Sequence, residues 1–430
     1  MVRYYTGPFL EESLADPLVM ERALRKTISL VGWKVWDKRY QDLDRQRRKF
    51  SISRRQIEEL YHLELTLPVL YKHLMLTGKL KINSPIEGDT VIFSGFIARL
   101  HDSLGGEGKR RLEGTIKNAL SSNDGFGPLR CELTALNAFL AEGCQVAAVD
   151  LEGLENFDYL CSLDGCEFEV ECKFVTSDLG AKIQRTEASS LAQSIVDRTM
   201  KTFGNLERGV IVTIVTENRL PSGRSEIDTI VGHVLSCLEE GSGTAHYGAT
   251  KITVEDWPSG KEDPASVHKE ATLKSLVDDA YTAGWHCPTG AIMLIFKSES
   301  QTGYYQAMKM RRKLVDAAEQ FSGSRPGIIF LEFENIGPHL EFKKLYASLI
   351  EDLLRDIGGK RKYLDRIILG FPGLPFSGGE SFDLVNPARD SGPQAELFNR
   401  FRIMTKPVPW ENPVMEWRRG WRSQWPNPSG

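Results

Sequence analysis

Residues 156–173 bring together the side-chain types that metal-dependent phosphoester chemistry needs. Asp158 supplies one carboxylate, and Glu171 and Lys173 supply a second carboxylate and an ammonium group two residues apart. Mg²⁺ prefers carboxylate oxygens and keeps part of its water shell, so Asp158 and Glu171 are suitable ligands. A bound metal lowers the pKa of its water, and a nearby lysine can position that water, help to deprotonate it or stabilise negative charge. We therefore predict a Mg²⁺- or Mn²⁺-dependent phosphodiester-cleaving site here.

The same segment predicts two strands joined by a tight turn. Residues 155–163 and 166–175 have the composition of strands, and Asp164-Gly165 between them is a hairpin-type turn. Around this hairpin we predict a helix at 129–142, strands at 145–151 and 209–215, and a helix at 178–203. The predicted order of elements over residues 126–216 is α-β-β-β-α-β.

Strand periodicity places the charged residues of 166–175 on one face and its apolar residues on the other. Glu169, Glu171 and Lys173 share the charged face, and Glu171 and Lys173 are roughly 7 Å apart along the strand. The carbonyl of Cys172 could add a third protein oxygen to the metal. Glu169 lies on the same face, so a second metal ion could also bind there. Asp158 reaches this patch only if the hairpin register places it opposite Glu171, which the sequence does not fix.

Glu132 is an independent candidate for the same site. It lies about one helical turn from both Leu129 and Leu136, beside the apolar stripe of its predicted helix. A carboxylate that leans toward a core is costly unless it is paired or bound to a metal. The alternative is a residue at the helix edge that reaches solvent.

This arrangement resembles the PD-(D/E)XK superfamily, the restriction-endonuclease-like nucleases. The resemblance covers residues 126–216 and implies that Asp158 and Glu171 bind Mg²⁺ or Mn²⁺, that Lys173 assists the attacking water, and that Glu132 is the first-helix carboxylate. Phe157 stands where the superfamily often has proline. Some members place further active-site groups after the third strand, at positions that correspond here to Lys182, Gln184 and Arg185.

The Glu-x-Lys pattern alone is weakly specific. It recurs at Glu107 in a Gly-rich loop, which lacks the spacing of a phosphate-binding motif, and at Glu341 in a predicted helix. The copy at Glu171 differs because it lies on a predicted strand and follows an Asp across a hairpin. An amphipathic hairpin with one charged face is the structural alternative, but it leaves Glu132 unexplained.

The totals describe an ordinary globular chain of two or three domains. It has 430 residues, 41% hydrophobic and 26% charged, with a formal net charge of −4. Binding of nucleic acid would therefore require a local basic face on the protein. Seven cysteines without paired spacing argue against a disulfide framework and against zinc. No signal peptide or run of about 20 apolar residues is evident, so we predict a soluble, cytoplasmic protein without a membrane partner.

The predicted fold class is α/β, with four regions. Residues 1–125 form a mainly helical N-terminal domain, 126–216 the PD-(D/E)XK-like core with a mixed sheet, 217–405 a C-terminal α/β extension, and 406–430 a Trp-, Pro- and Arg-rich tail. In the extension we predict helices at 225–240, 267–283, 303–321 and 339–357 and strands at 248–254, 291–296, 327–333 and 366–371. The extension could be a second α/β unit or a continuation of the first sheet.

Two basic segments lie outside the predicted core. Residues 38–50 interleave Lys and Arg with Tyr40 and Phe50, and residues 309–313 carry four basic side chains on a predicted helix. Both could follow a phosphate backbone, and both could equally be solvated helix faces. The tryptophans of 406–430 could dock on the body of the protein, on a partner or on bases.

The prediction is a nuclease that acts on nucleic acid, with DNA favoured over RNA by the resemblance alone. By analogy, we expect a role in bacterial defence against phage or foreign DNA. Cleavage of both strands would favour a homodimer, and a protein partner could bind through the N- or C-terminal regions. The competing hypothesis is a catalytically silent sensor or assembly subunit that keeps the nuclease-like fold and binds nucleic acid or protein.

Overall fold

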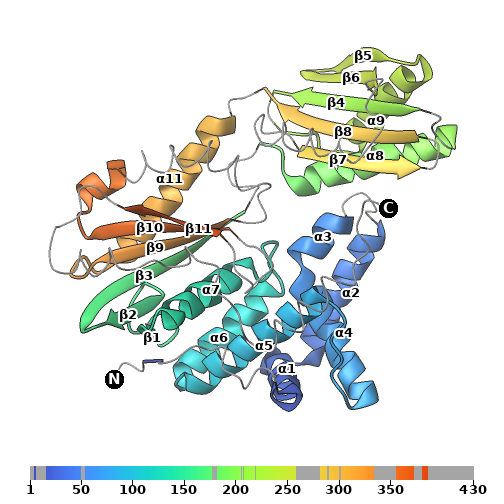
Figure 1. The fold of residues 1–430 in the computed structure, drawn as a ribbon. Helices are drawn as coiled ribbons and strands as arrows, with labels where there is room; N and C mark the ends of the chain where they lie inside the picture. Colours follow the sequence, from blue (N-terminus) through green and yellow to red (C-terminus); the bar gives the residue numbers. More distant parts are fainter. Residues whose placement is uncertain are drawn as a thin grey trace, which may run out of the picture.

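The structure is a computed structural model that describes most of the chain. The described residues are 4–5, 16–49, 54–176, 182–204, 206, 208–217, 219–257, 281–287, 290–299, 302–333, 355–371 and 380–385. Their architecture is α/β, with two separate mixed sheets and a group of helices at the N-terminal end (Figure 1). No helix in these ranges is long and apolar enough to cross a membrane.

The first part of the chain is helical, as predicted. Its elements are α1 (Pro17–Val31), α2 (Trp33–Lys49), α3 (Arg54–Leu60), α4 (His62–Thr77), α5 (Pro85–Ser103) and α6 (Gly106–Ala119). Side chains cap the starts of α1 and α5: Asp16 accepts from the backbone N–H of Leu18 at 2.8 Å, and Ser84 Oγ accepts from that of Glu87 at 3.2 Å. These caps satisfy N–H groups that have no partner within the helix.

The first of the two sheets has six strands. Its strands are β1 (Gln145–Ala148), β2 (Tyr159–Leu163), β3 (Cys166–Val175), β9 (Gly327–Phe333), β10 (Leu364–Phe371) and β11 (Glu380–Val385), in the order β1-β2-β3-β9-β10-β11. The β3–β9 and β9–β10 pairs are parallel, and the other pairs are antiparallel. Helix α7 (Gly127–Ala141) packs on one face and α11 (Thr302–Gln320) on the other (Figure 1).

The two faces of this sheet belong to different hydrophobic clusters. Phe168, Val170 and Cys172 of β3 pack toward α7, in a cluster that continues through α5 to α1. The opposite face contributes Ile329 and Leu331 of β9 to a cluster with α11. The predicted alternation of β3 is therefore confirmed for its apolar face. Because one cluster joins the N-terminal helices to the sheet, the predicted boundary at residue 125 does not separate two cores.

The predicted turn and the strand at 166–175 are confirmed, whereas the strand predicted at 155–163 begins only at Tyr159. Leu163 pairs with Cys166, so Asp164 and Gly165 form a two-residue loop, with φ angles of 50° and 82°. Positive φ at both positions is the type I′ geometry, which Asp-Gly favours. The ladder ends at Tyr159, which leaves Asp158 just before β2 instead of within it.

A second sheet has five strands and its own core. It contains β4 (Gly209–Thr216), β5 (Gly243–Tyr247), β6 (Thr250–Asp256), β7 (Tyr281–Cys287) and β8 (Gly290–Ser298), in the order β5-β6-β4-β8-β7. Helices α8 (Arg185–Phe203) and α9 (Arg224–Glu239) pack against it. Their cluster shares no residue with those of the six-stranded sheet.

The prediction that residues 126–216 form one core is wrong. Its last two elements, α8 and β4, belong to the second sheet, and β3 pairs instead with β9, which follows more than a hundred residues later. The burial of the two strands gives the reason: every residue of β9 is buried, whereas burial alternates along β4. A strand covered on both faces suits a sheet centre, and an alternating strand suits a sheet with one well-covered face.

The predicted extension is divided between the two sheets. Its strands at 248–254 and 291–296 lie in the second sheet, and those at 327–333 and 366–371 lie in the first. Residues 267–280 of the helix predicted at 267–283 lie outside the described ranges. Its last three residues, 281–283, are not helical but begin β7. The helix predicted at 339–357 falls outside the described ranges up to residue 354, and the tail at 406–430 falls wholly outside them.

Candidate active site

The turn and register of the hairpin bring Asp158 next to Glu171. Continuing the β2–β3 register one step beyond Tyr159 and Val170 places Asp158 opposite Glu171. The carboxylate of Asp158 turns toward β3, where its Oδ2 accepts from the backbone N–H of Cys172 at 2.6 Å. The backbone of Asp158 is also fixed, because its carbonyl accepts from Val149 N at 3.1 Å. The register, which the sequence did not fix, therefore places Asp158 opposite Glu171.

Glu171 and Lys173 lie side by side on the α11 side of β3. The Glu171 side chain is 3% exposed, and its Oε1 accepts a hydrogen bond from Lys173 Nζ. Its Oε2 is buried and has no hydrogen-bond partner. Burying a carboxylate oxygen without a hydrogen bond costs free energy, and a bound cation would offset that cost at this atom.

Glu132 belongs to the same electrostatic cluster. It lies on α7, and its backbone carbonyl accepts from the hydroxyl of Tyr159 at 3.0 Å, which ties α7 to the start of β2. Burial, followed by the charges of Asp158 and Glu171, raises the pKa of Glu132 well above its usual value. The charges of Asp158 and Glu171 therefore act on Glu132, whose side chain is half-buried and not fully exposed to solvent.

Burial also raises the pKa of the other two carboxyl groups. The pKa of Asp158 rises to about 6, although the hydrogen bond from Cys172 and the charge of Lys173 oppose the shift. The pKa of Glu171 rises to about 8, through burial and the charge of Asp158. Raised pKa values at three carboxyl groups indicate that nearby cationic side chains do not balance the negative charge of the ionised groups. A divalent cation would supply the missing positive charge.

Lys173 stays protonated in this environment. Burial opposes its charge, but the charge of Glu171 and the hydrogen bond to it outweigh burial, so the pKa of Lys173 is raised. A lysine with a raised pKa is a poor general base near neutral pH. Among the roles predicted for Lys173, its structure favours positioning of a water and stabilisation of negative charge.

The donor set fits a hard cation that keeps several waters. Within the described ranges, no three His, Cys, Asp or Glu side chains are grouped as metal ligands. The available protein oxygens are therefore the carboxylates of Asp158 and Glu171 and the carbonyl of Cys172. Since N–H and C=O of one strand residue point to the same edge, the Cys172 carbonyl faces the side on which its N–H meets Asp158. One or two carboxylates with retained waters is the usual coordination of Mg²⁺.

Glu169, the candidate for a second metal, is committed to structural bonds. It is fully buried, and its carboxylate accepts from Ser322 N at 2.7 Å, from the Ser322 hydroxyl and from Arg325 Nη1 at 3.1 Å. These bonds fasten the turn after α11 to β3. Both oxygens of Glu169 are occupied, so the structure does not favour a second metal through this residue.

Helix α11 contributes two residues that the sequence analysis did not assign to the site. Gln320 Oε1 accepts from Lys173 Nζ at 3.0 Å, and Lys313 Nζ donates to the carbonyl of Phe174 at 2.7 Å. Burial lowers the pKa of Lys313, and the nearby charge of Lys173 lowers it further. The basic run at 309–313 was a usable signal, but only the packing of α11 on β3 shows that Lys313 turns inward.

Asp150 is a further carboxylate near the cluster. It is the second residue after the apolar strand β1, and burial raises its pKa while Arg111 and Lys173 lower it. Arg111 of α6 donates to the Asp150 carbonyl at 3.0 Å, and Glu152 accepts from Gly105 N at 2.7 Å. The β1–β2 connection is thus held against α6, and the N–H of Gly105 in the Gly-rich loop binds a carboxylate of the protein itself.

The remaining predicted residues lie on other elements of the structure. Lys182, Gln184 and Arg185 lie at the start of α8, whose buried residues pack in the core of the second sheet. In the basic run of α2, buried Asp44 holds Arg47 at 2.6 Å and Arg48 at 2.8 Å. This pairing favours a structural helix face for that part of the run. Phe50 lies outside the described residues.

Comparison of the chain with models of known protein families, with curated proteins and with solved structures gave no match.

Proposed function

We propose that this protein is a Mg²⁺- or Mn²⁺-dependent nuclease with a PD-(D/E)XK-like core. The observation that carries the proposal is the meeting of Asp158 and Glu171 at the end of the β2–β3 ladder, with Glu171 Oε2 buried and unpartnered. The ammonium of Lys173 bonds to the other oxygen of Glu171. A cation between two carboxylates, next to a fixed ammonium group, is suited to phosphodiester hydrolysis.

The arrangement of the six-stranded sheet supports the same proposal. Its elements α7, β1, β2, β3, α11 and β9 run in the order α-β-β-β-α-β, with β9 parallel to β3. This is the order that the resemblance implies, with α11 and β9 in the last two places instead of α8 and β4. The elements from α8 to β8 then form an insertion between β3 and α11.

The chain's own residues have distinct roles in this proposal. Asp158 and Glu171 would hold the cation, with the carbonyl of Cys172 in reach, and Glu132 would support the cluster from α7. The cation would make bound water acidic and neutralise charge on the phosphate. Lys173, held in place by Gln320 and Glu171, would orient the attacking water and stabilise negative charge on the reacting phosphate.

The test is cleavage of plasmid DNA by the purified protein with Mg²⁺ or Mn²⁺. We expect cleavage by the wild type, none with EDTA, and a loss of roughly 100- to 1,000-fold in Lys173→Met, in line with removal of one charge-stabilising group. Glu171→Gln should be inactive, because the amide cannot replace a carboxylate ligand. Glu167→Gln is the matched control, since Glu167 lies on the same face of β3 but bonds to Arg325. Equal activity in all four proteins would refute the nuclease proposal.

Matched single-stranded DNA and RNA substrates separate the two kinds of nucleic acid. Cleavage of DNA alone is the expected result. If neither is cut but nucleic acid still binds equally well to wild type and Glu171→Gln, the silent sensor replaces the nuclease. The role in defence is tested by plaque counts on cells expressing wild type or Glu171→Gln, with protection expected only from the wild type.

A further inference from the structure

Lys313 of α11 is a cationic side chain near the candidate active site to which the proposed mechanism gives no role. Its side chain is half-buried, and its Nζ donates to the backbone carbonyl of Phe174 at 2.7 Å. Within the described residues this is its one hydrogen bond, although an ammonium group has three N–H donors. Burial and the charge of Lys173 lower the pKa of Lys313, and the carboxylate of Asp124 opposes the shift.

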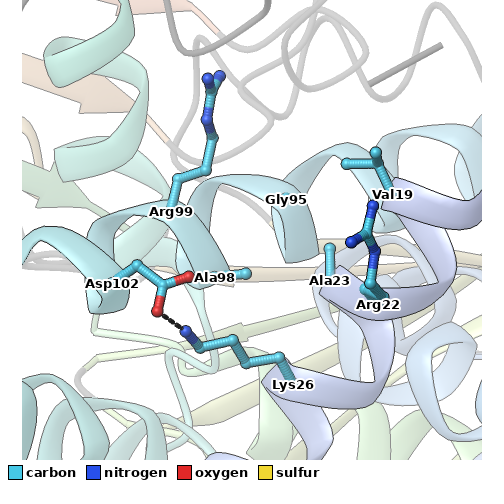
Figure 2. A pocket seen from close by; sticks show the side chains of 8 residues that line it. All are labelled: Val19, Arg22, Ala23, Lys26, Gly95, Ala98, Arg99 and Asp102. Atoms are coloured by element: carbon cyan, nitrogen blue, oxygen red, sulfur yellow. Dashed lines mark hydrogen bonds and ion pairs between the residues drawn. The ribbon is translucent and has the colours of Figure 1, made fainter. Parts of the chain in front are cut away.

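Two other half-buried lysines are each paired with a carboxylate. Lys173 pairs with Glu171. Lys26 pairs with Asp102 beside a cavity between α1 and α5 (Figure 2). Lys313 forms no such ion pair among the residues that the structure describes, and its nearest cationic neighbour repels it. An anion bound at Lys313 would offset the free-energy cost of burying this charge.

The carbonyl of Phe174 points to the same edge of β3 as Asp158. Along a strand, the N–H and C=O groups of successive residues point to opposite edges. The N–H of Glu169 donates to the backbone just before β9, whereas that of Cys172 donates to Asp158 on the opposite edge. Phe174 lies two residues after Cys172 and therefore faces the Asp158 edge. The ammonium group of Lys313 is held at that edge by its bond to this carbonyl.

No described strand covers this edge beyond the candidate metal site. The ladder with β2 ends at the pair of Tyr159 and Val170, so residues 171–175 have no partner strand there within the described ranges. The carbonyls of Cys172 and Phe174 are about 7 Å apart along the strand. This spacing is comparable to the distance between successive phosphates of an extended nucleic-acid strand. A strand with its scissile phosphate at the metal would thus bring the next phosphate toward Lys313.

We propose that Lys313 binds the phosphate next to the scissile phosphate of a nucleic-acid strand. The inference rests on the proposed nuclease function and adds that the substrate is a polynucleotide with a charged neighbouring phosphate. An ammonium group with two further N–H donors is suited to a phosphate, which offers oxygens in several directions. This contact is the same before and during hydrolysis, so it contributes to substrate binding and not to the chemical step.

The test is steady-state cleavage of a short DNA substrate that the wild type cuts. Lys313→Gln removes the charge but keeps an N–H donor for the Phe174 carbonyl. We expect its KM to rise about tenfold or more, the usual loss for one hydrogen bond to a charged group, with kcat unchanged. Arg312→Gln is the matched control, because Arg312 is the preceding residue of α11 and its side chain is 77% exposed. Its KM should stay at the wild-type value, and Lys173→Met should lower kcat instead.

A neutral phosphate analogue locates the contact. Once the cut is mapped, two substrates carry a methylphosphonate, which lacks the negative charge, at the phosphate on one side or the other of the cut. We expect one of them to raise the KM of the wild type about tenfold or more and to leave the KM of Lys313→Gln unchanged, because both changes remove the same contact. Arg312→Gln should respond as the wild type does. Melting curves verify that each variant is folded.

The proposal fails if Lys313→Gln keeps the wild-type KM, or if it lowers kcat with KM unchanged. It also fails if each methylphosphonate changes the KM of the wild type and of Lys313→Gln by the same factor. In these cases the wild type still cuts DNA, so the nuclease proposal stands. If the wild type cuts no nucleic acid, the nuclease proposal itself fails, and the contact with a neighbouring phosphate fails with it.

Discussion

At the scale of residues, the candidate site is a group of carboxyl groups whose pKa values burial raises. Glu171 and Asp158 have pKa values of about 8 and about 6, and the pKa of Glu132 is raised as well. Lys173 partly compensates this charge, yet Glu171 Oε2 remains without a partner. Because this negative charge is only partly balanced, the stability of the protein and its affinity for a cation should both change with pH.

The first prediction concerns Mg²⁺ and pH. The folded metal-free protein keeps a proton on Glu171 up to about pH 8, whereas the unfolded chain loses it near the ordinary value of 4.5. The folded state therefore binds more protons in this window, and its stability falls as pH rises through it. Cation binding needs the ionised carboxylate, so Mg²⁺ affinity rises over the same window. We expect Mg²⁺ to raise the melting temperature more at about pH 8.5 than at about pH 6.

The isosteric variant Glu171→Gln should lose this response to Mg²⁺ and most of its pH dependence in that window. Glu167→Gln should keep both. A melting temperature that responds to Mg²⁺ identically in wild type and Glu171→Gln would place the cation elsewhere.

The second prediction concerns Gln320. Its amide oxygen accepts from Lys173 at 3.0 Å, and a hydrogen bond to a charged group contributes about 1.5–3 kcal/mol. We expect Gln320→Leu to reduce DNA cleavage about tenfold or more and to leave the Mg²⁺-induced rise in melting temperature unchanged, because Gln320 holds the ammonium group and not the cation. The adjacent Glu319→Gln is the control, since Glu319 is exposed and pairs with Arg361. Loss of the Mg²⁺ response in Gln320→Leu would contradict this role.

At the scale of elements, the packing of α2 against α4 contains a buried ion pair that lacks a hydrogen bond. Glu64 of α4 is 1% exposed, and Arg39 of α2 lies 3.6 Å from its Oε1, too far for a hydrogen bond. Both oxygens of Glu64 lack a hydrogen-bond partner. Burial raises the pKa of Glu64 to about 7, although Arg39 opposes the shift. The protonated carboxyl is thus the form that this helix contact prefers.

The third prediction follows from that preference. Between pH 4.5 and about 7 the folded state holds a proton on Glu64 that the unfolded chain has lost, so ionisation destabilises the fold as pH rises. Glu64→Gln removes this titration. We expect the free energy of unfolding of the wild type to fall by roughly 3 kcal/mol relative to Glu64→Gln between these pH values, at about 1.4 kcal/mol per pKa unit. Urea unfolding of both proteins at each pH measures the difference. Parallel pH profiles would show that Glu64 ionises normally.

At the scale of the whole molecule, two sheets with separate cores make up one chain. The six-stranded sheet shares its core with α1, α5 and α7, whereas the second sheet is covered by α8 and α9. The second sheet lies between β3 and α11 in the sequence. Separate cores allow separate unfolding, since cooperativity depends on shared buried contacts.

The fourth prediction is that calorimetry shows two unfolding transitions. Gly290 at the start of β8 has no room for a side chain, because a Cβ there would meet the backbone carbonyls of Leu206 and Arg208. Gly290→Ala should therefore lower the transition of the second sheet by several degrees and leave the other in place. Mg²⁺ should raise only the transition that Gly290→Ala does not move. A single transition that moves with both changes would show that the two sheets unfold together.

The sequence by itself determined the local parts of the site. Alternation along residues 166–175 predicted β3 to the residue, and Asp164-Gly165 predicted the turn. Both depend on backbone preferences of neighbouring residues, which the sequence shows directly. The position of Glu132 beside an apolar stripe also predicted that it is not fully exposed, because helical spacing fixes which side chains share a face.

Only the tertiary structure decided which distant elements complete the site. The burial of β9 on both faces and the alternation of β4 are consequences of the sheets they join, so strand patterns alone did not show that β3 pairs with β9. Gln320 and Lys313 reach the site because α11 packs across β3. The raised pKa of Glu171 likewise depends on burial in a sheet where β3 pairs with β9, a strand more than a hundred residues away in the sequence.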